Sequence, residues 1–358
     1  MAIEPMTLAL AGIAIFLPVL AFAGSAALGG SATVHQLRSC GFEPDGDAWV
    51  HRRGGVVLTA RISQVDTHDW LEILGPRLPV DAPVFRARTQ VPAGSILSGD
   101  VDFDAAVAAT HHDAATGLAW MSSEVRAAAR EAVALPARVV DRRWRYRNVC
   151  TAESLAPIVD ALARVSAAME AGPSSTNVGL ASLVRADPNP AVRVRALESL
   201  AARNAADQHV VDVVVRSAQP DLLLAAVRSG GPYSPDAWEA LTRFGSRRQR
   251  AEGVVALACH VINGRIVRCE AGSLVPPLLD ALTEPTQAHR VPPLLGQLNP
   301  PRLLQAIVDR FGTEVPQPLA PLLRDLREAA RPNARGSVSL VDASSGGLAL
   351  ADDDAKQA

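Results

Sequence analysis

Aromatic residues are scarce in this chain. Phe, Trp and Tyr together make up 4% of its 358 residues, although hydrophobic residues as a whole make up 48%. Ala, Leu and Val must therefore supply most of the buried surface. This composition favours thin, helix-rich layers and disfavours a large pocket lined by aromatic rings. A chain of this length also exceeds one typical core, which predicts two folded domains and additional segments.

Lysine is nearly absent, since Lys356 is the only one and arginine supplies the other cationic side chains. The formal net charge is −2. A protein that binds nucleic acid mainly through its phosphates needs a basic excess. The charge balance therefore indicates that nucleic acid is not the main partner.

Cysteine pairs and the common catalytic motifs are missing as well. None of the four cysteines forms C-x-x-C, which argues against a zinc knuckle or a thioredoxin-type redox pair. The chain also lacks the phosphate-binding loop G-x-x-x-x-G-K-[ST], a G-x-G-x-x-G after a strand, and the G-x-S-x-G nucleophile motif. The sequence therefore predicts no cofactor, no bound metal and no catalytic residue.

Cys259 lies in the apolar run VVALACHVI, which predicts a buried structural thiol. A disulfide between Cys259 and Cys269 is the alternative if the protein is exported.

Residues 7–28 form a long apolar run without a charged residue, long enough to cross a bilayer as one helix. A cleaved signal peptide with the site Ala21-Phe22-Ala23 is one alternative, but no basic residue precedes the run. A buried core helix is the other, although such a helix rarely lacks charge on every face. We therefore expect residues 1–30 to be an uncleaved transmembrane anchor.

Basic residues follow this run rather than precede it, since Arg38, Arg52 and Arg53 come soon after its end. By the positive-inside rule, the body should lie in the cytoplasm and the short N-terminus outside. The expected location is the inner (cytoplasmic) membrane, with a single pass.

Residues 31–172 are predicted to form a small α+β domain. Short β-rich runs are separated by Gly and Pro breakers, and two longer segments have apolar residues at helical spacing. The predicted strands are 48–50, 55–62, 70–74, 84–87, 107–110, 137–140 and 144–146, and the predicted helices are 122–134 and 154–171.

The last two of these strands form a hairpin around the polar turn Asp141-Arg142-Arg143. Within residues 143–147, arginine alternates with Trp144 and Tyr146, so the aromatic rings share one face and the arginines share the other. This alternation predicts a sheet with a basic outer face. Close to a membrane anchor, such a face is suited to an anionic lipid or an acidic protein tail.

The order of these segments resembles a module in uncharacterised membrane proteins of GC-rich bacteria. The shared order is G-D-x-x-F-D, a strand, a helix beginning Ser-Ser-Glu-Val-Arg, a hairpin and a closing helix. In those proteins a transmembrane segment precedes a small domain of unknown function, so the resemblance implies no catalytic residues. The matching residues are Gly99, Asp100, Phe103, Asp104, Ser122, Ser123, Glu124, Val125 and Arg126.

Residues 173–332 read as helices in pairs, with proline at or near many helix starts, where its missing N–H costs nothing. The predicted helices are 177–185, 190–203, 206–217, 220–229, 235–244, 247–262, 273–282, 286–298, 301–311 and 318–330. In Asp187–Arg203, the clearest of these segments, the expected apolar face consists of Val192, Ala196, Leu197 and Leu200.

The run Asp187-Pro188-Asn189-Pro190-Ala191-Val192-Arg193 resembles the turn and second helix of HEAT-like repeats. That resemblance implies an all-α HEAT-like solenoid, whose helices bury their apolar faces by stacking. An irregular helical domain is the alternative. Residues 333–358 are Ser-, Gly- and Ala-rich, end in an acidic run, and are expected to be disordered.

Two polar clusters could carry chemistry. His111, His112 and Asp113 are adjacent, but no H-x-x-x-H or H-E-x-x-H spacing supports a metal site, so we expect an exposed turn. Asp100 and Asp104 belong to an alternating acidic run that lacks the Gly and Glu of a calcium loop. A hydrolase or metal-dependent enzyme with its site in the α+β domain, at Asp100, Asp104, His111 and His112, remains an alternative.

The expected architecture is thus multidomain: a transmembrane helix, a small α+β domain and a HEAT-like solenoid. Repeat stacks offer extended faces and no enclosed reaction pocket. The sequence therefore predicts a membrane-anchored, non-enzymatic scaffold that binds a protein partner, and an exported envelope-binding protein is a further alternative. The expected contact residues are Arg193, Arg195, Glu198, Arg247, Arg248 and Arg250.

Overall fold

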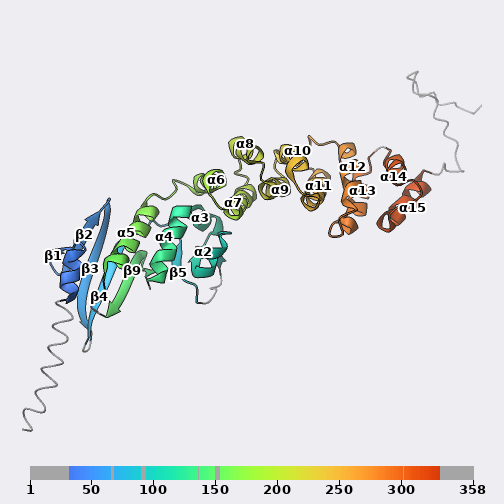
Figure 1. Cartoon of the computed structure of the whole chain (residues 1–358). Helices are drawn as coiled ribbons and strands as arrows, with labels where there is room; N and C mark the ends of the chain where they lie inside the picture. The colour runs from blue at the N-terminus through green and yellow to red at the C-terminus, as the bar shows by residue number, and fades with distance from the viewer. Residues whose placement is uncertain are drawn as a thin grey trace, which may run out of the picture. The chain divides into compact units, whose positions relative to one another are not determined.

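The computed structural model of the chain describes residues 32–65, 68–89, 94–135, 137–149, 154–300 and 302–330. A small β-containing domain is followed by a helical region (Figure 1). The chain divides into two compact units, Met1–Glu270 and Ala271–Ala358. Both sides of the predicted boundary at residues 172 and 173 belong to the first unit, and that boundary stays a prediction.

The predicted anchor at residues 7–28 and the predicted tail at 333–358 lie outside the described residues. Within the described part of the chain, no helix combines the length and the apolar character that a membrane span requires.

The first unit contains a six-stranded antiparallel sheet with the strand order β1-β2-β3-β4-β9-β8, preceded by a helix at residues 32–39. Apolar residues at alternate positions, such as Leu58, Ala60 and Ile73, are buried on one face of this sheet. Helix α5 packs against β3, β4 and β9. The bounds are β1 Glu43–Asp45, β2 Ala48–Arg53, β3 Val56–Val65, β4 His68–Arg77, β8 Arg138–Val140, β9 Arg143–Val149 and α5 Ala156–Glu170.

The hairpin of β8 and β9 confirms the predicted alternation. Trp144 and Tyr146 are buried, and the arginines stand between them on the other face of β9. The two turn residues, Asp141 and Arg142, both have positive φ, 49° and 62°. Positive φ at both central residues marks the turn type whose twist matches that of paired strands. The turn type and the alternation of buried and exposed residues therefore both specify how β8 pairs with β9.

A second sheet, of order β5-β7-β6, lies beside the first. The ring of Phe85 in β5 stacks on Trp144, with 6.0 Å between centroids, and joins the two sheets. Helix α4 contacts β5, β7 and α5. The bounds are β5 Val84–Ala87, β6 Ser95–Ile96, α2 Val101–Ala106, β7 Val107–Thr110, α3 Ala114–Ala119 and α4 Ser123–Ala134.

Three helix pairs follow in the first unit and form two layers. Helices α7, α9 and α11 pack side by side in one layer, α6, α8 and α10 form the other, and sequential helices pair across them (Figure 1). The four apolar residues predicted for the face of α7 are all buried. The bounds are α6 Thr176–Ala186, α7 Pro190–Ala202, α8 Gln208–Ser217, α9 Pro220–Ser229, α10 Ser234–Phe244 and α11 Arg247–Ile262.

The second unit is a small helical cluster with a Leu-rich core. Helix α12 contacts α13 and α14, and α15 contacts the same two helices. Leu278, Leu295, Ile307 and Leu323 are buried among them. The bounds are α12 Val275–Ala281, α13 Val291–Leu298, α14 Leu303–Phe311 and α15 Ala320–Ala329, with short 3-10 turns before α12, α13 and α15.

Cys259 is a half-buried free thiol. The alternative of a Cys259–Cys269 disulfide is therefore wrong for this structure.

Candidate functional site

The turn between α6 and α7 positions two polar residues, Asp187 and Asn189. Asp187 ends α6 in an extended conformation, as expected for a residue before proline. The side chain of Asn189 then accepts a hydrogen bond from Ala191 N at 3.0 Å, and Pro190 occupies the first helical position. These features fix the start of α7, and the Asp187 carboxylate accepts a hydrogen bond from Asn189 N at 2.9 Å.

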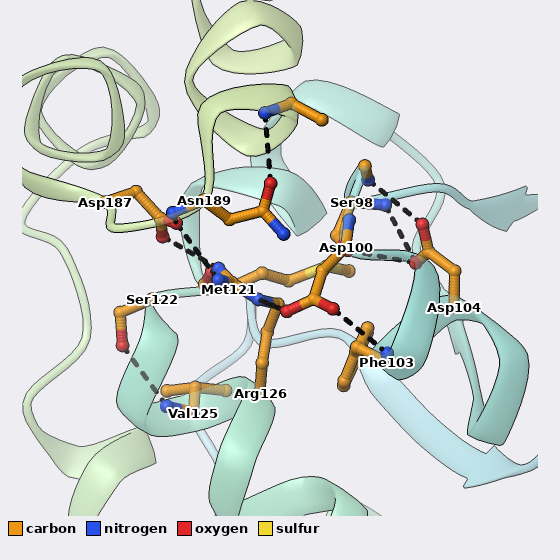
Figure 2. A network of polar contacts seen from close by, with 12 residues as sticks. Ser98, Asp100, Phe103, Asp104, Met121, Ser122, Val125, Arg126, Asp187 and Asn189 are labelled. Atoms are coloured by element: carbon orange, nitrogen blue, oxygen red, sulfur yellow. Dashed lines mark hydrogen bonds and ion pairs between the residues drawn. The ribbon is translucent and has the colours of Figure 1, made fainter.

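Arg126 of α4 receives that carboxylate in a buried ion pair. Its two terminal nitrogens donate to Asp187 at 2.8 and 3.0 Å, and both side chains are almost fully buried (Figure 2). Its Nε donates to Asp100 at 3.0 Å, and Nη1 also donates to the Met121 carbonyl at 2.7 Å. The Arg126 guanidinium therefore links α4 and the start of α2 to the α6–α7 turn.

The charges in this network stabilise one another. Burial alone would lower the pKa of Arg126, but the hydrogen bonds and charges of Asp187 and Asp100 outweigh it and raise that pKa. Burial alone would likewise raise the pKa of Asp100, yet the Phe103 N–H, Arg126 and Arg130 lower it overall. The network is largely satisfied internally, so we assign it a structural role.

Arg193 is also buried, with 9% of its surface exposed. Its Nε donates to the Val184 carbonyl at 2.7 Å, and Nη1 donates to the Gln219 side chain at 3.0 Å. It therefore connects α7 to the end of α6 and to the residue that precedes α9. The expectation that Arg193 stands on an accessible face is corrected, because this side chain holds the two layers together.

The other predicted contact residues are exposed. Arg195 and Glu198 lie on α7 with 3.8 Å between their charged groups. The arginines at the start of α11 are exposed too, and one of them, Arg250, donates to the Gly245 carbonyl at 3.0 Å. The accessible members of the predicted set are Arg195, Glu198, Arg247, Arg248 and Arg250.

Glu198 lies on a groove along the C-terminal ends of α7 and α9, with a volume of about 920 Å³. The C-terminal ends of helices carry a partial negative charge, although several of the last carbonyls here, such as those of Leu200, Ala226 and Arg228, already have hydrogen-bond partners. Arg228 on its wall forms an ion pair with Glu252. We call this the helix-end groove, and its lining residues are Glu198, Ala201, Ala202, Asn204, Ala206, Ala225, Arg228, Ser229, Gly230, Gly231, Pro232, Tyr233 and Arg265.

The Gly230-Gly231 pair shapes the floor of the helix-end groove. Gly230 ends α9 with φ +70°, and a Cβ there would lie 2.6 Å from the ring of His260. A Cβ on Gly231 would lie 2.5 Å from the Tyr233 ring. The backbone can therefore pass close to both rings only without side chains. The sequence signal for this floor is Gly-Gly-Pro directly after a predicted helix.

Of the residues of the enzyme alternative, Asp100 pairs with Arg126, and the others make local contacts. Asp104 accepts hydrogen bonds from Ser98 N at 3.0 Å, Ser98 Oγ at 2.9 Å and Gly99 N at 3.0 Å. His111 Nδ1 lies 3.0 Å from Asp113 N, and the rings of His111 and His112 are 4.0 Å apart. His111 is half-buried, in contrast to the exposed turn predicted for it.

Among the residues that the structure describes, no group of three or more His, Cys, Asp or Glu side chains could hold a metal ion. The enzyme alternative stays a prediction.

Comparison with protein families, with curated proteins and with solved structures finds no match to this chain.

Proposed function

We propose that this protein is a non-enzymatic scaffold that binds a protein partner through its helical region. The observation that carries this proposal is the helix-end groove. Its volume of about 920 Å³ and its position along two helix ends suit a segment of polypeptide lying across them. Glu198, predicted as a contact residue, is part of its wall.

The chemistry of the groove favours a partner segment with hydrogen-bond donors. The Glu198 carboxylate can accept hydrogen bonds from such a segment, and the partial negative charge at the ends of α7 and α9 favours a cationic group. Arg228 is already paired with Glu252, so its charge opposes a cationic partner less strongly, and Arg265 is the other arginine of the lining. Backbone amides or a Lys or Arg side chain of the partner would meet Glu198.

The same proposal includes a HEAT-like repeat architecture for the helical region and a membrane anchor at residues 7–28. The two-layer packing of α6 to α11 and the Asp-Pro turn before α7 support the first. The uncharged apolar run supports the second, and the arginines that follow it support a cytoplasmic body.

Site-specific photocrosslinking in native membranes tests the groove. Benzoylphenylalanine replaces Ala202, which is exposed on the groove wall at the end of α7. The matched control replaces Ala186, which is exposed at the end of α6 and does not line the groove. We expect a crosslinked protein with the probe at Ala202 that is missing with the probe at Ala186.

Charge reversal provides the second measurement. Glu198→Arg should reduce this crosslink by about tenfold, because it replaces an acceptor with a like charge beside Arg228. Glu170→Arg, an exposed change on α5, should leave it intact. Equal capture from Ala202 and Ala186, or an unchanged crosslink in Glu198→Arg, would overturn the proposal.

The orientation has its own test with two C-terminal fusions. A green fluorescent protein fusion should fluoresce, and an alkaline phosphatase fusion, which is active only outside the cytoplasm, should be inactive. An active phosphatase fusion would instead favour the exported, envelope-binding alternative.

A further inference from the structure

A second groove, separate from the helix-end groove, lies between β5, β8, β9 and the end of α4. Its volume is about 670 Å³, which is in the usual range for small-molecule sites. Four of its lining side chains are arginines and none is acidic. We call it the arginine groove, and these arginines are Arg86, Arg138, Arg145 and Arg147.

Strand register forces these charges together. Arg138 of β8 is paired directly with Arg145 of β9, so both side chains leave the sheet on the same face. Arg147 is two residues farther along β9 and shares that face. Like charges placed directly opposite each other destabilise a sheet. The hairpin therefore carries an electrostatic cost that a bound anion would remove.

The surrounding residues neutralise little of this charge. The Arg145 Nε lies 2.6 Å from the Glu72 carboxylate, and the Arg147 guanidinium lies over the Trp70 ring at 5.0 Å. Among the described residues, no ion pair involves Arg86, Arg138 or Arg147. The Arg145 Nε–H is buried and makes no hydrogen bond despite its short distance to Glu72. Four positive charges thus face one negative charge.

We propose that the arginine groove binds a phosphate monoester. Guanidinium groups present planar pairs of N–H donors that match phosphate oxygens, and several of them converge here. Val133, Val139 and Val140 line the same groove and offer an apolar wall to the organic part of the ligand. The ligand is a soluble phosphate ester or a phosphatidic acid headgroup, because both present the same dianionic group.

Calorimetric titration of the full-length protein tests this site. The probes are glycerol 3-phosphate, short-chain phosphatidic acid and, as a ligand without the monoester, short-chain phosphatidylcholine. We expect saturable binding of the first two and none of the third. Equal affinity for both phosphates indicates a soluble ligand, and tighter binding of the lipid indicates the headgroup.

Two variants assign the binding to the groove. Arg138→Gln and Arg147→Gln should each weaken binding about tenfold, the loss expected for one charged hydrogen bond. Both side chains are exposed, so circular dichroism should confirm an unchanged fold. Arg185→Gln, which removes one exposed arginine from α6 outside the groove, is the matched control.

Three results would overturn the proposal. The first is no saturable binding of either phosphate, and the second is the same loss in Arg185→Gln as in the groove variants. The third is a tri-aspartate peptide that binds more tightly than both phosphates, which would identify the site as one for acidic protein segments. None of these results depends on whether the helix-end groove binds a partner.

Discussion

Arg126 explains at the level of single residues how the β-containing domain is fixed to the first helices of the helical region. A buried guanidinium is costly unless carboxylates and carbonyls surround it. Asp187, Asp100 and the Met121 carbonyl fulfil that requirement from three separate segments. Because each segment needs the others, the junction forms only when all three are in place.

Asp187→Ala should therefore destabilise the first unit by about 3–5 kcal/mol, since it leaves a buried charge without its main partner. Urea denaturation followed by circular dichroism measures this loss. The matched control is Asp212→Ala, which removes the exposed partner of Arg216 and should cost less than about 1 kcal/mol. If Asp187→Ala costs no more than about 1 kcal/mol, as expected for the control, Arg126 does not depend on Asp187.

Acid sensitivity follows from Asp100 and Asp113. Although burial raises the pKa of Asp100, the Phe103 N–H, Arg126 and Arg130 lower it overall. The Thr116 hydroxyl, with the Ala115 N–H and Arg203, lowers the pKa of Asp113 against the effect of burial. A carboxyl with a lowered folded-state pKa binds fewer protons when folded. Its stabilisation is thus present above the unfolded pKa of about 3.9 and lost as the pH falls through the folded value.

The urea midpoint should therefore be nearly constant from about pH 6 to pH 5 and fall below about pH 4. Asp100→Asn lowers stability at neutral pH and should reduce the steepness of that fall. An equally steep acid dependence in Asp100→Asn would mean that this carboxyl does not contribute.

Arg193 shows why part of the candidate site could not be predicted. Its spacing of three, four and seven residues from Ala196, Leu197 and Leu200 puts it on the apolar face of α7, but spacing does not show which polar groups would meet a charge there. What buries Arg193 is the Val184 carbonyl on α6 and the Gln219 side chain before α9. Those partners come from other helices, so their position depends on packing that no local pattern contains.

At the level of elements, most helices of the helical region were predictable because their ends carry strong local signals. Proline in the first turn marks the starts of α7, α9 and α10. Helices α2 and α3 were missed because each has six residues, too few for a helical period to emerge. The only local signals of their starts are the N-cap residues Asp100 and Asp113.

Helix α11 offers a test of such an end signal. The Ser246 side chain accepts from Gln249 N, and the Gln249 side chain accepts in return from Ser246 N, which forms a capping box. Ser246→Ala should therefore cost about 1 kcal/mol of stability in urea denaturation.

The control is Ser199→Ala inside α7, where the hydroxyl bonds only to the Arg195 carbonyl one turn earlier. This change should be neutral or slightly stabilising, because alanine is the better helix former. A loss in Ser199→Ala as large as that in Ser246→Ala would show that helix propensity, and not the cap, determines the effect.

At the level of the whole molecule, the chain is two compact units whose division was not apparent from composition. Residues 172–176 are rich in Gly, Pro and Ser, a composition typical of linkers, yet they lie inside the first unit. The two compact units meet after α11, next to residues 263–270, which contain no proline and one glycine. Helix α3 contacts both α6 and α7 across residues 172–176, and such contacts cannot be read from local composition.

Limited trypsin digestion tests this division. Residues 263–270 contain no helix or strand, and Arg268 is exposed beside Val267, which is 90% exposed. A protease needs several residues free of regular structure, so Arg268 should be cut before the arginines within α6 to α11. Arg265 should be cut more slowly, because the next residue, Ile266, is buried. Mass spectrometry should then find a fragment that begins at Cys269.

Arg268→Gln should slow the appearance of that fragment and leave the rate of cleavage at other sites unchanged. General unfolding would instead expose all sites to trypsin. The N-terminal fragment, which ends at Arg268, should keep its circular dichroism spectrum, because the sheet, the Arg126 network and the helix layers all lie before the cut. Loss of structure on cleavage, or a first cut inside α6 to α11, would mean that the two units fold as one. In that case a ligand in the arginine groove would stabilise the whole chain against unfolding, and not the first unit alone.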